Sequence, residues 1–185
     1  FITLIADGFP WFGADVGGVL AIVPAFGCLW LMANGEPINF RRLFGVGVAG
    51  VVALSGLALF DLSRPKESQT HLGRFVRKLF DGEAGTIIER KVSANIHMLT
   101  SSVWTWLVPI VAVFFIVLMF RSKGALMRVR SEILGLDALI VSATVLGVLG
   151  FAVNDSGVVI PSMMFGVMVP LTLSALAYVE NKGAK

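Results

Sequence analysis

The sequence is poor in the residues from which most soluble catalytic and metal sites are built. It has one cysteine and two histidines, and charged residues make up 15% of its 185 positions. The single cysteine excludes an internal disulfide and a cysteine-rich metal cluster. Both histidines lie in a polar segment, which excludes a haem held by two histidines within membrane spans. The GxxxxGK[ST], GxSxG and HExxH motifs are also absent, so P-loop, hydrolase and zincin sites are not predicted.

What is abundant is apolar residues: 56% of the chain is hydrophobic and its mean hydropathy is +0.85. Five runs approach the length of about 20 residues that crosses a bilayer. The sequence therefore predicts an all-α, polytopic membrane bundle of about five transmembrane helices in a single membrane domain, residues 1–185. The predicted spans are 16–33, 43–60, 103–120, 132–153 and 157–178. Because "FITLIA" reads like the end of an earlier helix, we expect a fragment of a longer chain.

The basic residues predict an orientation. Although the net charge is +3, Lys and Arg cluster beside the apolar runs, which indicates topology and headgroup contact and no nucleic-acid partner. One side of the predicted bundle carries Arg41, Arg42, Arg121, Lys123, Arg128, Arg130, Lys182 and Lys185. We therefore expect residues 7–15, the loop 61–102 and the turn 154–157 to be extracytoplasmic. Asp137, early in the fourth span, is expected to pair with Arg128 or Arg130.

The loop 61–102 has helical periodicity. After the N-cap Thr70, apolar residues recur at the spacing of an amphipathic helix that would lie in the membrane interface: Leu72, Phe75, Val76, Leu79 and Phe80. A second helix is predicted over 83–99, burying Ile88, Val92, Ile96 and Leu99. The other sides of this second helix carry Arg90, Lys91, Asn95 and His97.

Polar residues at the predicted span ends are the first candidate site. Asn154, Asp155 and Ser156 precede the fifth span, either as a helix cap or as the lining of a polar cavity. If the first and last spans pack antiparallel, Asp7 and Asp15 would meet Asn154 near His71 and Arg74. Such a group could bind a divalent cation or perform acid/base chemistry, but no tight ligand spacing is present and no metal ligand is assigned.

Cationic residues of the loop are the second candidate site. His71, Arg74 and Lys78 share one flank of the first amphipathic helix. They are suited either to ordinary headgroup contact or to a lipid-linked phosphate or diphosphate, which Arg binds through two parallel hydrogen bonds. Arg90, Lys91 and Asn95 would extend this patch.

Four motifs carry a family resemblance: "GADVGGVLAIVPAF", "THLGRFVRKL", "RKVSANIHML" and "NDSGVV". In this order they resemble the C-terminal part of uncharacterised multipass membrane proteins of Gram-positive bacteria, actinobacteria included. The resemblance implies the plasma membrane of a bacterium. It also implies that an extracytoplasmic domain similar to the alkaline-phosphatase superfamily precedes the spans in some members. Its recurrent motif positions are Asp15, His71, Arg74, Arg90, Asn95, Asn154, Asp155 and Ser156.

The sequence thus predicts an integral membrane protein whose extracytoplasmic face binds a phosphate-bearing envelope lipid or lipid-linked glycan, supporting transfer, hydrolysis or translocation. Its partners would be membrane lipids and other membrane chains or upstream segments, and no cofactor is assigned. The alternative is a non-catalytic accessory subunit of a larger respiratory or envelope complex. A proton-coupled transporter is less favoured because few ionisable residues lie at mid-membrane depth. The predicted binding residues are His71, Arg74, Lys78, Arg90, Asn95, Asp15, Asn154, Asp155 and Ser156.

Overall fold

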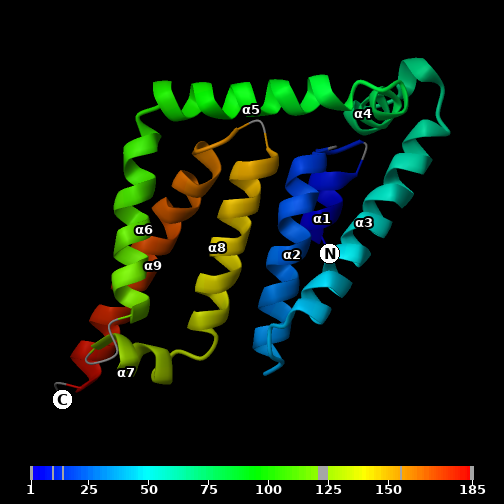
Figure 1. The fold of residues 1–185 in the computed structure, drawn as a ribbon. Helices are drawn as coiled ribbons and strands as arrows, with labels where there is room; N and C mark the ends of the chain where they lie inside the picture. Colours follow the sequence, from blue (N-terminus) through cyan, green and yellow to red (C-terminus); the bar gives the residue numbers. More distant parts are fainter. Residues whose placement is uncertain (1, 10, 14, 121–124, 155, 184–185) are drawn as a thin grey trace.

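The computed structural model describes residues 2–9, 11–13, 15–120, 125–154 and 156–183, and the regular structure in these residues is entirely helical. Four helices are long and apolar enough to cross a membrane: α2 (Val16–Ala33), α3 (Phe40–Leu62), α8 (Leu136–Val153) and α9 (Val159–Gly183). A fifth, α6 (Trp104–Phe120), has 17 residues and stands beside α9 (Figure 1). The predicted all-α bundle with about five spans is therefore confirmed.

Small residues allow the closest helix pair, α2 and α8, to approach each other. The two helices run antiparallel, so the start of α2 meets the end of α8 (Figure 1). A Cβ atom on Gly17 would lie 2.9 Å from the carbonyl oxygen of Val153. Ala21 and Ala25 on α2 are also buried, whereas Gly147 and Gly150 of α8 lie against Pro161 and Ile160 of α9. Such residues let helix backbones pack directly in a membrane, where apolar burial supplies little attraction between helices.

Helix α3 packs on α2 through a face that the sequence did not predict. A Cβ atom on Gly27 or on Gly50 would collide with a valine of the other helix, Val46 or Val23. Gly45, Ala49 and Ala53, which repeat at four-residue spacing, are instead exposed on α3. Residues 45–50 also read GxGxxG, but they lie inside this helix and not after a strand, so they do not form a dinucleotide-binding turn.

A second core holds the other half of the bundle together. Its buried residues come from α6, α7 (Ala125–Glu132), α8 and α9: Val111, Val129, Leu136, Ile140, Met168 and Val179. The predicted span 132–153 begins only at Leu136, because Gly135 takes a φ of 85° and separates α7 from α8. Across this break Arg130 donates two hydrogen bonds to Asp137, at 2.7 and 2.8 Å, so the predicted ion pair is confirmed for Arg130.

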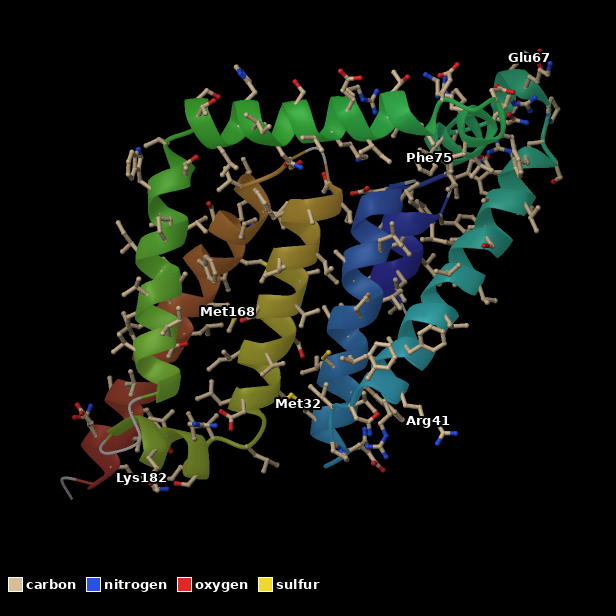
Figure 2. The ribbon with its side chains drawn as sticks, viewed as in Figure 1. Met32, Arg41, Glu67, Phe75, Met168 and Lys182 are labelled. Carbon is tan, nitrogen blue, oxygen red and sulfur yellow. The ribbon has the colours of Figure 1, made fainter. Side chains whose placement is uncertain are left out.

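Three further helices lie at one end of the bundle. They are α1 (Ile2–Gly8), α4 (His71–Phe80) and α5 (Ala84–Ser101), and a 3₁₀ turn (Lys66–Ser68) precedes α4. Helix α5 crosses the ends of the upright helices and makes an angle of 83° with α6 (Figure 1). Figure 2 shows Glu67 and Phe75 at this end, and Arg41 and Lys182 at the opposite one. The predicted polar segments therefore gather at one end of the bundle.

The two predicted loop helices are confirmed, but the four apolar residues of the second that were predicted to be buried are exposed. Thr70 caps α4 by accepting a hydrogen bond from the Leu72 amide, and Leu72 is buried. Leu79 and Phe80 at the end of α4 are exposed. On α5, Ile88, Val92 and Ile96 are 62%, 52% and 56% exposed, and Leu99 is also exposed. Helical spacing predicted an apolar stripe correctly, but the stripe of α5 does not pack against the rest of the chain.

Candidate functional site

Two carboxylates meet where the chain folds back from α1 into α2. The Asp15 amide donates to the Asp7 carbonyl oxygen at 2.9 Å, which closes the turn between the helices. A Cβ atom on Gly18 would run into the Asp7 carboxylate and would lie 2.9 Å from Oδ2 of Asp15. The two carboxylates therefore lie next to each other over Gly18, where any side chain would displace them.

Asn154 joins this pair to the end of α8. Its side-chain amide donates to Oδ2 of Asp15 at 2.8 Å, and its Oδ1 accepts from the Ser156 amide at 3.1 Å. Asn154 is thus the C-terminal cap of α8 and part of a turn. The predicted role of Asn154 as a simple cap of the last span is therefore wrong, since its amide holds α8 against the start of α2. Asp155 lies outside the described residues.

Helix α5 covers the same place with two polar side chains. Lys91 Nζ donates to the carbonyl oxygen of Val153 at 3.0 Å, at the end of α8 where the helix dipole favours a cation. Asn95 Oδ1 lies against Gly157, because a Cβ atom on that glycine would be 2.5 Å away. We call Asp7, Asp15, Lys91, Asn95 and Asn154 the polar junction.

The junction contains two buried oxygen atoms without a hydrogen-bond partner in the described part of the chain: Oδ2 of Asp7 and Oδ1 of Asn95. Burial raises the pKa of Asp7, and the negative charge of Asp15 raises it further. Such a carboxyl can hold a proton or accept a hydrogen bond. Among the described residues no group of three His, Cys, Asp or Glu side chains is placed to hold a metal ion. The chemistry available to the junction is therefore proton exchange and hydrogen bonding.

The structure brings together only some of the predicted site residues. Asp15, Asn95 and Asn154 meet at the junction, and Ser156 is exposed beside it. Lys91 and Asn95 of α5 contact this group, whereas Arg74 of α4 donates to the carbonyl oxygen of Thr70.

Three of the predicted cationic residues, Arg74, Lys78 and Arg90, are exposed on α4 and α5. Arg74 is exposed and donates from Nε to the Thr70 carbonyl oxygen at 3.3 Å. Lys78 lies 3.7 Å from Glu83, and Arg90 is exposed on α5. The side chain of His71 is not among those the structure describes. The cations therefore form an outer surface, separate from the junction.

Sequence reasoning missed a rigid joint between α3 and α4, which we call the elbow (residues 61–77). Asp61, at the end of α3, accepts hydrogen bonds from the Thr70 amide (3.0 Å), the Thr70 hydroxyl (2.8 Å) and the Gly73 amide (2.8 Å). The Arg64 guanidinium donates to it at 3.0 Å and lies over the ring of Trp11, 4.6 Å from its centre. The elbow fixes the first turn of α4 by satisfying its free amides.

Gln69 completes the elbow from the inside. Its amide nitrogen donates to the carbonyl oxygens of Leu62 and Arg64, at 3.1 and 2.9 Å, and its Oε1 accepts from Arg77 at 3.0 Å. The only signal of the elbow in the sequence was Asp61, an acidic residue at the end of an apolar run. Thr70 and Gly73, which bond to Asp61, lie nine and twelve residues further along the chain, at a spacing that marks no known motif.

The polar junction and the exposed cations of α4 and α5 are thus identified only from the structure of this chain. No protein-family model, curated protein or solved structure matches the chain. The family resemblance described above stays a prediction.

Proposed function

We propose that this chain is a membrane domain that binds the phosphate-bearing head of a lipid or lipid-linked glycan at the end covered by α4 and α5. The observation that supports the proposal is that Arg74 and Arg90 are exposed on two helices lying at the ends of the apolar spans. Lys78 adds a third cation, whose partner Glu83 is half exposed. This binding would support transfer, hydrolysis or translocation of the lipid.

The chemistry of these groups favours phosphate. An arginine binds a phosphate through two parallel hydrogen bonds, and a lysine adds a mobile point charge. Helices that lie at the membrane surface present such cations at the depth of the headgroups. The exposed pair of Lys78 and Glu83 contributes little stability and is easily exchanged for a phosphate contact.

The charge at the other end of the bundle supports the orientation. Arg41 and Lys182 lie at the end opposite α4 and α5 (Figure 2). The start of α3, which carries Arg42, and helix α7, which carries Arg130, lie at the same end (Figure 1). Short cytoplasmic segments retain positive charge, so we place that basic end in the cytoplasm and the α4–α5 end outside it. The bound lipid would then belong to the outer leaflet of a bacterial plasma membrane.

Lipid recovery from purified protein tests the proposal. The variant Arg74→Ala/Lys78→Ala/Arg90→Ala is compared with Arg41→Ala/Arg130→Ala/Lys182→Ala, which removes the same charge from the opposite end. Mass spectrometry of the extracted lipids should show a severalfold loss of anionic phospholipid or polyprenyl phosphate in the first variant only. The lipid class that is lost distinguishes the two sources of phosphate. Equal recovery from both variants would refute the proposal.

A specific observation favours the second candidate, an accessory subunit of a larger membrane complex. Gly45, Ala49 and Ala53 form an exposed stripe along α3, and small residues of this kind let another membrane helix approach closely. Gly45→Leu/Ala49→Leu should release the chain from a larger complex on blue-native gels. Val51→Leu, on a different face of α3, should not. Migration of the wild type without a partner would remove this candidate.

A further inference from the structure

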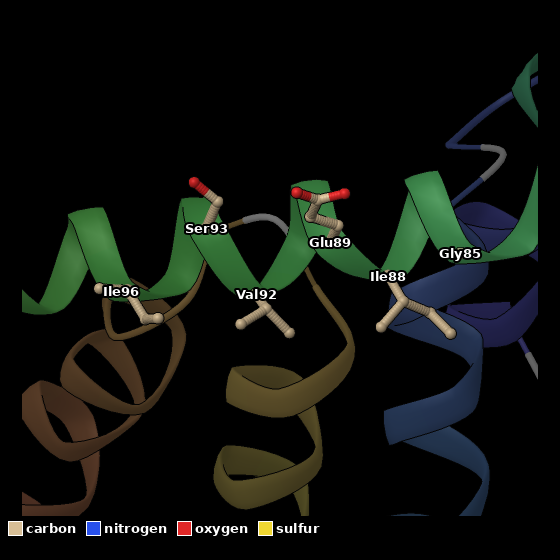
Figure 3. Close-up of a pocket in the computed structure, with 6 residues that line it drawn as sticks. All are labelled: Gly85, Ile88, Glu89, Val92, Ser93 and Ile96. Carbon is tan, nitrogen blue, oxygen red and sulfur yellow. The ribbon is translucent and has the colours of Figure 1, made fainter.

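Helix α5 has an apolar stripe that no other part of the described chain covers. Ile88, Val92 and Ile96 follow one another at four-residue spacing and, with Gly85, Glu89 and Ser93, line an open groove. Figure 3 shows the three side chains pointing toward the side of the helix where the spans lie, whereas Glu89 and Ser93 point the opposite way. The stripe therefore faces the level of the hydrocarbon, and the polar side faces away from it.

Contacts on the flank of α5 next to the stripe fix the position of this helix. Lys91 bonds α5 to the end of α8, and Asn95 lies against Gly157 in the turn before α9. Since α5 makes an angle of 83° with α6, its axis runs across the ends of the spans and not along them. At that level a bilayer changes from hydrocarbon to headgroups.

The surface beside the stripe is also apolar. Helix α6, which continues from α5 after a sharp bend, exposes Trp106, Ile110 and Val113 along its length. An apolar surface on a chain with several membrane spans is suited to lipid chains, and a tryptophan near the bend is typical of the membrane boundary. The stripe of α5 and the outside of α6 therefore adjoin.

From these observations we infer that α5 lies in the plane of the membrane and that its stripe rests on the acyl chains of the leaflet at the α4–α5 end. The inference deepens the proposed function, on whose membrane placement it rests, by naming the hydrocarbon part of a lipid as the ligand of Gly85, Ile88, Val92 and Ile96. The junction then lies on the hydrocarbon side of α5.

Site-directed spin labelling tests this directly. Single cysteines are introduced at Ile88 and Val92, and at Arg90 and Ser93 as matched controls, in the Cys28→Ser protein reconstituted into phosphatidylcholine–phosphatidylglycerol vesicles. Labels at 88 and 92 should collide more with oxygen, which concentrates in hydrocarbon, than with a water-soluble nickel chelate. Labels at 90 and 93 should show the reverse. If Cys28→Ser does not fold, native Cys28 is kept, because this buried thiol is shielded from the label.

Two results would overturn the inference. Labels at 88 and 92 that favour the nickel chelate would place the stripe in water. Labels there that meet neither reagent would show that a protein partner or a second copy covers it. The recovery of phosphate-bearing lipids is a separate measurement. The stripe can therefore be shown to contact hydrocarbon even if the cations bind no phosphate, and the cations can be shown to bind phosphate even if the stripe does not contact hydrocarbon.

Discussion

Two carboxylates at the same end of the bundle, one fully buried and one half-buried, have opposite surroundings. Asp61 in the elbow is fully buried and accepts from the Thr70 amide and hydroxyl, the Gly73 amide and the Arg64 guanidinium. Asp7 in the junction has a buried Oδ2 with no partner among the described residues, and it lies next to a second carboxylate, Asp15.

The difference distinguishes a structural joint, the elbow, from a candidate site, the junction. Native proteins pair almost all buried polar atoms, so the four donors around Asp61 are accounted for by its structural role in joining α3 to α4. An unpartnered buried oxygen beside a like charge costs stability, and such cost is typical of places where protons or ligands exchange. The elbow should therefore tolerate no change, whereas the junction should tolerate change or improve with it.

The largest expected effect is at the elbow. Asp61→Ala leaves the amides of Thr70 and Gly73 and the Arg64 guanidinium without their acceptor, at a cost of about 3–5 kcal/mol. Thermal unfolding in detergent, followed by tryptophan fluorescence, measures the loss. Asp81→Ala, at the exposed end of α4, is the control and should unfold near the wild-type temperature. Equal midpoints for the two variants would show that the elbow is not a joint.

A pair of glycines sharpens the comparison. A Cβ atom on Gly73 would lie 2.6 Å from Oδ2 of Asp61, and one on Gly157 would lie 2.5 Å from Oδ1 of Asn95. Asp61 is held by its donors, so Gly73→Ala must break them, at a net cost of about 2 kcal/mol after the gain in helix propensity. Asn95 Oδ1 has no partner in the described chain and can turn away. Gly157→Ala should cost only about 1 kcal/mol, from its φ of 50°.

Unfolding midpoints of the two glycine variants, measured side by side, decide the point. Gly45→Ala serves as the control, because open space surrounds that position. A larger loss for Gly157→Ala than for Gly73→Ala would mean that Asn95 is as firmly fixed as Asp61.

Most of the fold could be predicted because membrane spans are encoded locally. Each predicted span corresponds to a helix, and the errors lie at the ends, where capping decides. Helix α3 begins at Phe40 because the Asn39 side chain accepts from the Arg42 amide, and α8 begins after Gly135. Packing partners are not encoded locally, so the apolar residues of α5 were wrongly predicted to be buried.

The junction could be predicted in part for a topological reason. Antiparallel spans necessarily bring Asp15 and Asn154 to one end of the bundle, and the structure joins them by a hydrogen bond. The sequence could not predict that α5, and not α4, supplies contacts to the junction, because the elbow sets the direction of α4. That joint depends on Asp61 and Gln69, whose bonds are specific to this fold.

The smallest expected effect, and the only gain, is at Asp7. Because the pKa of Asp7 is raised above its ordinary value of 3.8, the folded chain binds this proton more tightly than the unfolded chain does. Stability from this group is present at low pH and is lost as the pH rises through the raised pKa. Asp7→Asn removes the charge, so at neutral pH it should stabilise the protein by about 1 kcal/mol.

Unfolding midpoints measured from pH 4 to pH 8 test the prediction. The advantage of Asp7→Asn over the wild type should grow as the pH rises and shrink as it falls, because the wild-type carboxyl, with its raised pKa, takes up a proton in acid. Asp81→Asn, an exposed carboxylate of the same end, should show no such gain. A loss of stability in Asp7→Asn at neutral pH would mean that the Asp7 carboxylate is held as firmly as that of Asp61, and the contrast between junction and elbow would fail.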